Sequence, residues 1–88
     1  MTTTDYHAID CDRHSLLELL AMRRMAVEVV AVDESGQPQR LEGNVVDVLT
    51  RDGAEYLVLR HTGAEPVSLR LDRLRTISDL AGETLWRQ

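Results

Sequence analysis

The sequence predicts a mainly β domain, in which about five antiparallel strands form a small, bent sheet closing toward a barrel, with one N-terminal α-helix. Helical periodicity is confined to one stretch near the N-terminus, and β-branched runs separated by short turns follow it. Gly43 interrupts the longest of these runs, where a bulge or a sharp bend is expected. Because the chain has 88 residues, we expect a single domain over residues 1–88 with one hydrophobic core.

The helix is predicted over residues 12–23, after a loose N-terminal arm over residues 1–9. Asp12 is the expected N-cap, because its carboxylate can accept from backbone N–H groups of the first turn that lack a partner inside the helix. Asp10 precedes it, where the helix dipole favours negative charge. Apolar residues at helical spacing are expected to form a stripe on the core side: Leu16, Leu17, Leu19, Leu20 and Met22.

The strands are predicted within residues 25–78, which form the β body. Runs rich in valine, leucine and isoleucine define them: 25–33, 39–50, 54–61, 67–72 and 73–78. Asp52-Gly53 is typical of the tight turn in a β-hairpin. The tail, 79–88, ends in Leu85-Trp86 and is expected to wrap onto the body.

The charge is negative and uneven. The formal net charge is −5, all ten basic residues are arginine, and residues 1–20 alone carry four acids against one arginine, a net of −3. The four acids form a group at the helix head: Asp5, Asp10, Asp12 and Glu18. An acidic protein repels phosphate backbones, so general nucleic-acid binding is disfavoured. The group is either a surface for a basic partner or a solvated helix end whose acids cap and balance the dipole.

The predicted compartment is the cytoplasm. The chain has one cysteine, so no disulfide can form within it. The N-terminal residues lack the basic and apolar regions of a signal peptide, and no apolar run approaches the ~20 residues that span a membrane.

A metal or thiol site is a possible interpretation of Cys11 and His14, which have a C-x-x-H spacing. A structural zinc site needs four ligands, yet the other histidines are His7 and His61, and there is no second cysteine. We favour a partly buried thiol at the helix start. A nucleophile–base pair of Cys11 with His7 or His14 is disfavoured, because so short a chain rarely holds a deep substrate pocket.

Three stretches carry short motifs in a fixed order. The first is Tyr6-x-x-Ile9-x-Cys11-Asp12 followed by Leu17-Glu18-Leu19; the second is Glu55-Tyr56-Leu57-Val58, with Arg51 ahead of it; the third is Leu69-Arg70-Leu71-Asp72, with Ser78 after it. These motifs, their order and their spacing resemble the Rof family of Rho-binding antiterminators. The resemblance spans positions 6 to 78. It departs at Arg13-His14-Ser15, where the family usually has more acid and an aromatic residue.

The resemblance implies an Sm-like barrel with an N-terminal helix, and a regulatory protein that is not an enzyme and needs no cofactor. It implies binding to the Rho hexamer at the primary RNA-binding site, on the OB-fold of Rho's N-terminal domain, so that RNA loading and Rho-dependent termination are reduced. Asp12 and Glu18 match the family motif and are the best interface candidates. Asp5, Asp10 and Arg13 are candidates from position and charge, and Arg51 from its matching position.

The alternative is an Sm-like RNA-binding module that uses arginines of the predicted strands. Acids alternate with these arginines along the sequence, which favours cross-strand ion pairs over a basic face. The arginines concerned are Arg51, Arg60, Arg70, Arg73 and Arg75. We expect a monomer when the protein is free, because the strand edges are rich in charge.

Overall fold

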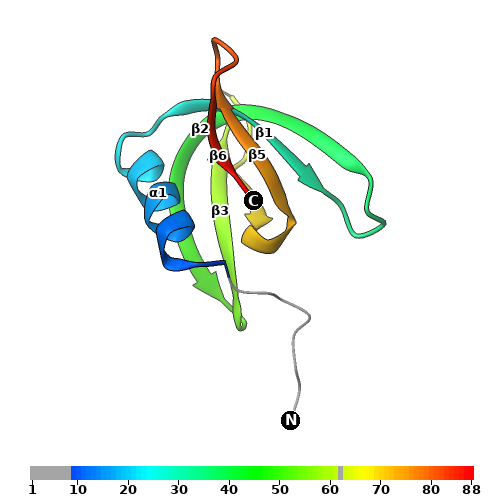
Figure 1. The fold of residues 1–88 in the computed structure, drawn as a ribbon. Coiled ribbons are helices and arrows are strands. Elements are labelled where there is room, and N and C mark those ends of the chain that lie inside the picture. The colour runs from blue at the N-terminus through cyan, green and yellow to red at the C-terminus, as the bar shows by residue number, and fades with distance from the viewer. Residues whose placement is uncertain (1–8, 62) are drawn as a thin grey trace.

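The computed structural model describes residues 9–61 and 63–88 (Figure 1). The helices and strands follow one another along the chain as α1 (Cys11–Met22), β1 (Ala26–Val32), β2 (Pro38–Arg51), β3 (Ala54–Arg60), β4 (Val67–Arg70), the 3₁₀ turn η1 (Leu71–Arg73), β5 (Leu74–Asp79) and β6 (Thr84–Arg87). The predicted mainly β fold with a helix near the N-terminus is confirmed. Among the described residues, no helix has the length and apolar character needed to cross a membrane.

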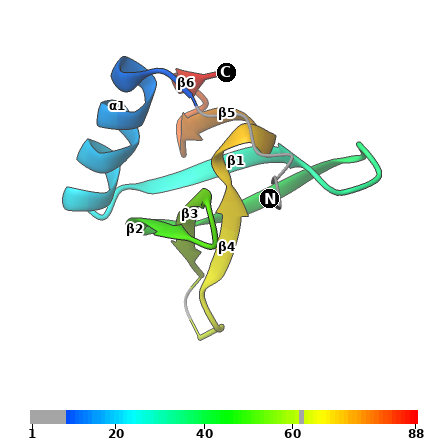
Figure 2. The ribbon, with the colours of Figure 1, turned by 90° about the horizontal axis from the view of Figure 1, so that it is seen from below.

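Within the described part of the chain, six antiparallel strands form one sheet in the order β4-β3-β2-β1-β5-β6. The expectation of about five strands therefore misses one, because the tail contains β6, whose Trp86 pairs with Ile77 of β5. The edge strands β4 and β6 do not pair with each other across the described residues, so the sheet curls but stays open (Figure 2).

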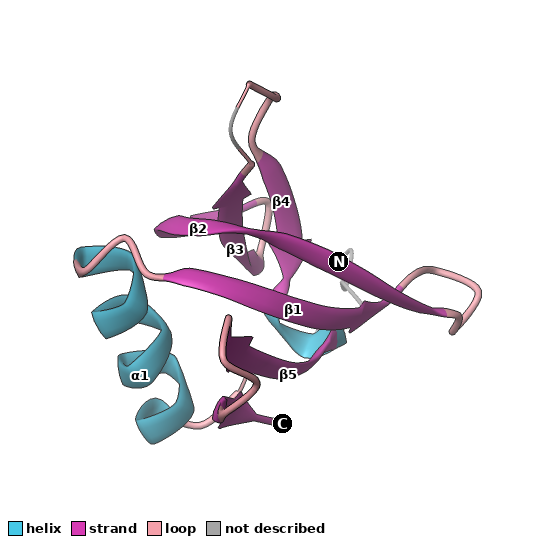
Figure 3. Cartoon of the chain, turned by 90° about the horizontal axis from the view of Figure 1, so that it is seen from above, coloured by secondary structure: helices cyan, strands magenta, loops and turns pink. Residues whose placement is uncertain are grey.

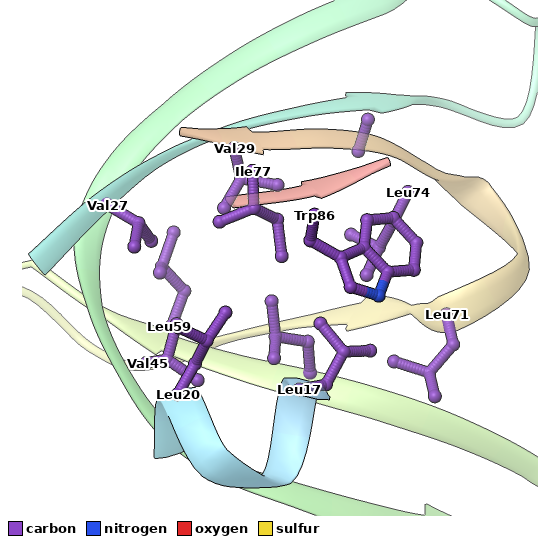
Figure 4. Close-up of a cluster of buried hydrophobic side chains, with 12 residues drawn as sticks. Leu17, Leu20, Val27, Val29, Val45, Leu59, Leu71, Leu74, Ile77 and Trp86 are labelled. Atoms are coloured by element: carbon purple, nitrogen blue, oxygen red, sulfur yellow. The ribbon is translucent and has the colours of Figure 1, made fainter. Parts of the chain in front are cut away.

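The core lies inside the curl of the sheet and is made of aliphatic side chains and one indole (Figure 4). Its fully buried members come from α1, from four strands and from η1: Leu17, Leu57, Leu71, Leu74, Ile77, Val27, Val29 and Val45. Trp86 is 2% exposed and fills the space between β5 and α1. Burying this apolar surface is the main force that holds the helix against the sheet.

Helix α1 begins one residue earlier than predicted, and its N-cap is Asp10 rather than Asp12. Asp10 has an extended backbone (φ −71°, ψ 164°), and its Oδ1 accepts a hydrogen bond from the backbone N of Arg13 at 2.8 Å. Asp12 lies in the first helical turn. At the other end Arg23 is the C-cap, and Arg24 has a left-handed backbone (φ 48°) that turns the chain into β1.

The predicted apolar stripe of α1 is only partly correct. Leu17 and Leu20 are buried and Leu16 packs against the core, but Leu19 is 38% exposed and Met22 is 81% exposed. The sheet covers a narrower face of the helix than five apolar residues would need, and the strands that mainly contact α1 are β2 and β6. The helix lies at one end of the curled sheet (Figure 3). Two large apolar side chains are thus left at the surface.

Strand β2 approaches β3 unusually closely at one place and has a bulge at another. A Cβ on Gly43 would lie 2.7 Å from the carbonyl oxygen of Arg60, so only glycine permits this approach of β3. The register shift lies farther on, between Val45 and Asp47, where Val46 is the extra residue. The expected bulge or bend at Gly43 is therefore a close backbone contact, and the bulge itself is three residues away.

Candidate partner-binding surface

The first acid of the helix head, Asp10, is paired within the molecule. Its carboxylate accepts from the backbone N of Arg13 and also contacts the guanidinium of Arg13. The backbone hydrogen bond from Arg13, followed by the charge of the same residue, lowers the pKa of Asp10 below its ordinary value. Both side chains therefore stabilise the start of the helix, and their opposite charges largely cancel.

Arg13 also joins the helix head to the C-terminal strand. Its Nε donates to the carbonyl oxygen of Arg87 at 2.9 Å, and the indole Nε1 of Trp86 donates to the carbonyl oxygen of Arg13 at 3.0 Å. The two hydrogen bonds fix the first turn of α1 against β6. Arg13, which we predicted as an interface residue from its charge, has a positioning role in this structure.

Asp12 and Glu18 remain exposed on α1. The carboxylate of Asp12 has no ion-pair or hydrogen-bond partner among the described residues. Because a helix turns about 100° per residue, these two acids point about 120° apart around the axis. They therefore lie on two flanks of the exposed helix face rather than in one compact group.

On the flank of Glu18, the structure adds acids from the sheet. The imidazole of His14 has Nδ1 at 3.5 Å from Glu18 Oε1 and Nε2 at 2.6 Å from Glu55 Oε2, at the start of β3. The Glu55 contact has the length of a close ion pair but not the alignment of a hydrogen bond. His14 thus brings two carboxylates from different elements to one place. We use the term acidic surface for four carboxylates around the exposed side of α1: Glu18 and Glu55 at His14, Asp47, which lines a groove together with Glu18, and Asp12 on the other flank of the helix.

A groove runs along this flank between α1 and β2, which lie side by side (Figure 1). It has a volume of about 400 Å³ and is lined by Glu18, Ala21, Met22, Val46, Asp47 and Val48. The bulge at Val46 shifts the alternation of β2, so consecutive side chains of the strand contribute to the lining. The groove is lined by four apolar residues and by two acids, Glu18 and Asp47.

Arg51 does not join the acidic surface. Its guanidinium carbon lies 4.7 Å from the centre of the Tyr56 ring, a cation–π contact. Because neighbouring residues of a strand point to opposite faces, Tyr56 and Glu55 are on opposite faces of β3. Arg51 therefore lies on the face of the sheet opposite to Glu55. Asp5 lies outside the described residues.

The arginines of the strands are largely engaged within the molecule. Arg70 contacts both carboxylate oxygens of Asp72, with Nη2–Oδ2 at 2.6 Å, and Arg75 Nη1 donates to the carbonyl oxygens of Asp72 and Leu74. Elsewhere on the sheet Arg40 is 3.7 Å from Glu28. Of the five arginines considered for a basic face, Arg70 thus forms an ion pair, but with Asp72 two residues away rather than across strands.

The thiol of Cys11 is exposed, so the expected partly buried thiol is wrong. It occupies the first helical position, where the side chain points away from the core. Over residues 9–61 and 63–88, no cluster of three or more histidine, cysteine, aspartate or glutamate side chains has the arrangement of a metal site. His7 lies outside these residues.

Comparison with protein families decides the relationship. The family model described as "Modulator of Rho-dependent transcription termination (ROF)" matches residues 8–84. The chain belongs to the Rof family. Comparison with curated protein sequences gives no match. The Rof match covers the acidic surface and the groove, and it includes Arg13 but ends two residues before Trp86.

Sequence reasoning missed three residues of the acidic surface and the groove: Asp47, Glu55 and, as an exposed side chain, Met22. For Glu55 a signal was present. It shares a strand face with Leu57 and Leu59 by simple alternation, and a carboxylate beside two core leucines needs a polar partner. His14 is that partner. The position of Asp47 depends on the bulge at Val46, and the exposure of Met22 depends on how wide a helix face the sheet covers. Neither feature has a local signature in the sequence.

Proposed function

We propose that this Rof-family chain binds Rho at its primary RNA-binding site, on the OB-fold of the N-terminal domain, and competes there with RNA. One observation carries the proposal: Asp12 and Glu18 lie exposed on a helix that His14 joins to Glu55 of β3 and that Arg13 joins to β6. A site that binds RNA is basic because it faces phosphates. Carboxylates held on a rigid frame can occupy such a site at little cost in conformational entropy.

The proposal assigns the protein no catalytic step and no cofactor: inhibition follows from occupancy alone. A partner that acts in transcription places the protein in the cytoplasm. We propose a monomer when the protein is free, with each chain engaging one N-terminal domain of the Rho hexamer. The exposed Asp12 and Glu18 supply the contacts. Asp10 and Arg13 act indirectly, by fixing the start of the helix.

An isothermal titration of the chain against Rho from the same organism tests the proposal. We expect saturable binding that cytidine-rich RNA displaces and that weakens as salt concentration rises. Asp12→Lys is expected to lower the affinity for Rho without unfolding the domain. Its matched control is Glu65→Lys, which changes the net charge equally at an exposed position in the β3–β4 turn.

Two results would contradict the proposal. Equal affinities of Asp12→Lys and Glu65→Lys, in folded proteins, would remove the helix head as the contact. Failure of the wild-type chain to bind Rho even at low salt would remove the function. In that case direct RNA binding with a steep salt dependence would favour the RNA-binding module instead.

A further inference from the structure

The groove between α1 and β2 has an exposed apolar wall. Met22 is 81% exposed, more than the other large apolar side chains of the described chain, and it stands at the C-terminal end of α1 opposite Val46 and Val48. Single exposed apolar residues are common on protein surfaces. Here, however, the residue forms one side of a hollow whose other side carries Val46 and Val48, so a slender aliphatic chain would contact apolar side chains from both elements.

The margin of the same hollow carries two carboxylates, Glu18 from the helix and Asp47 from the strand. Oδ1 of Asp47 accepts from the backbone N of Val48 at 2.8 Å, which orients the carboxylate. Glu18 is oriented by His14, 3.5 Å away. The two acids come from different elements and bound one opening, so a cation placed there would be attracted by both.

An aliphatic stem that ends in a cation is the chemistry of arginine. Its methylene groups pack on apolar surface while the planar guanidinium, with five donors, can bind two carboxylates at once. A volume of about 400 Å³ is at the lower end for ligand sites and suits one long side chain better than a cofactor. The negative margin disfavours phosphates and other carboxylates.

We propose that this groove receives an arginine side chain of the protein partner, with its stem against Met22 and Val48 and its guanidinium between Glu18 and Asp47. The inference rests on the proposed function, since it names the chemistry by which the partner is held on this flank. The groove contact and Asp12 lie on different flanks of α1. A complete interface with the partner would therefore engage both flanks.

A small probe tests the groove without the partner. Acetyl-arginine amide is titrated into protein carrying ¹³C-methyl methionine, and acetyl-citrulline amide serves as the uncharged control of equal shape. We expect saturable shifts of the Met22 methyl signal but not of Met25, on the order of fivefold weaker binding for citrulline, and a comparable loss in the Glu18→Gln/Asp47→Asn variant. Equal effects of the two probes, or no shift at Met22, would overturn the inference.

Affinity measurements with Rho then distinguish this inference from the proposed function. Met22→Ser and Asp47→Asn are expected to lower affinity for Rho severalfold, whereas Leu80→Ser, at a 63% exposed apolar residue in the β5–β6 turn, is expected to leave it unchanged. If Asp12→Lys weakens Rho binding and both groove variants do not, the groove is overturned and the function stands. If Rho does not bind while arginine still shifts Met22 selectively, the function is overturned and the groove stands. Shifts of Met22 that depend only on protein concentration would assign the groove to a second copy and overturn the inference.

Discussion

Nε2 of His14 lies 2.6 Å from Oε2 of Glu55, which joins the first half of helix α1 to the start of strand β3. The same ring is 3.5 Å from Glu18 through its other nitrogen. Without the imidazole, two carboxylates would face each other across the helix–sheet boundary. The sequence departs from the family pattern at this histidine. In this structure the histidine lies between the two carboxylates and contacts both.

We expect a measurable coupling between His14 and Glu55. In a double-mutant cycle with His14→Ala and Glu55→Ala, the free energies of unfolding should deviate from additivity by about 0.5–1 kcal/mol, since both side chains are roughly a quarter exposed. Urea denaturation followed by circular dichroism measures this. The control cycle pairs Glu55→Ala with His61→Ala, whose ring contacts the Glu42 carbonyl oxygen instead. Additive behaviour in both cycles would mean that the His14–Glu55 contact contributes nothing.

Gly43→Ala should destabilise the domain. The new Cβ would lie 2.7 Å from the carbonyl oxygen of Arg60, which forces β2 and β3 apart at a cost of about 1–3 kcal/mol. Glu42→Ala, at the neighbouring exposed position, should change the free energy of unfolding by less than about 0.5 kcal/mol. A stability of Gly43→Ala equal to that of the control would show that the strands separate there freely.

Trp86→Ala should cost about 3–5 kcal/mol of unfolding free energy, because it empties the space between β5 and α1. Trp86→Phe keeps most of the apolar contact and loses only the hydrogen bond to the Arg13 carbonyl oxygen, so about 1 kcal/mol is expected. Circular dichroism is the suitable signal, since Trp86 is the only tryptophan. Equal losses in the two variants would assign the whole effect to the hydrogen bond.

Stability should fall in acid partly through the β1–β2 turn. Oδ1 of Asp33 accepts from the hydroxyl of Ser35 and from the backbone N of Ser35 and Gln37, and the Ser35 hydroxyl is the main cause of its lowered pKa. A carboxylate with a folded-state pKa below the unfolded value of 3.8 stabilises the fold above that value. This stabilisation is lost as the pH falls through the lower folded-state pKa.

Asp33→Asn should therefore flatten the dependence of unfolding free energy on pH in this acidic range, and Glu65→Gln should leave it unchanged. Denaturant titrations at a series of pH values compare the variants with the wild type. Parallel curves for all three proteins would show that Asp33 titrates equally in the folded and unfolded chain.

Patterns that depend on local chemistry were predictable from the sequence. The helix, the first three strands and the Asp52-Gly53 hairpin lie within one or two residues of their predicted bounds. The N-cap was assigned wrongly because Asp10 and Asp12 both suit the role by residue type. Only the extended backbone of Asp10 distinguishes them.

Features that depend on tertiary contacts were not predictable. Thr84–Arg87 is too short to be recognised as a strand, and it becomes one because Trp86 has the core to fill and β5 to pair with. Leu19 and Met22 fit a helical stripe, but the curvature of the sheet decides how much of that stripe is covered. The acidic surface likewise needs Glu55 and Asp47 to be brought to α1 by pairing and by a bulge.

The hydrogen bond from Trp86 to Arg13 joins residues 73 positions apart, and this has a kinetic consequence. Contacts between distant parts of a chain form late, because closing the loop between them costs entropy before the packing contacts can compensate for that loss. We therefore expect the hairpins to form first and the helix head to dock on β6 near the end of folding. Molecules that have paired most of their strands would still lack a correctly oriented α1, and the carboxylates of that helix would reach their final positions only in the last folding step.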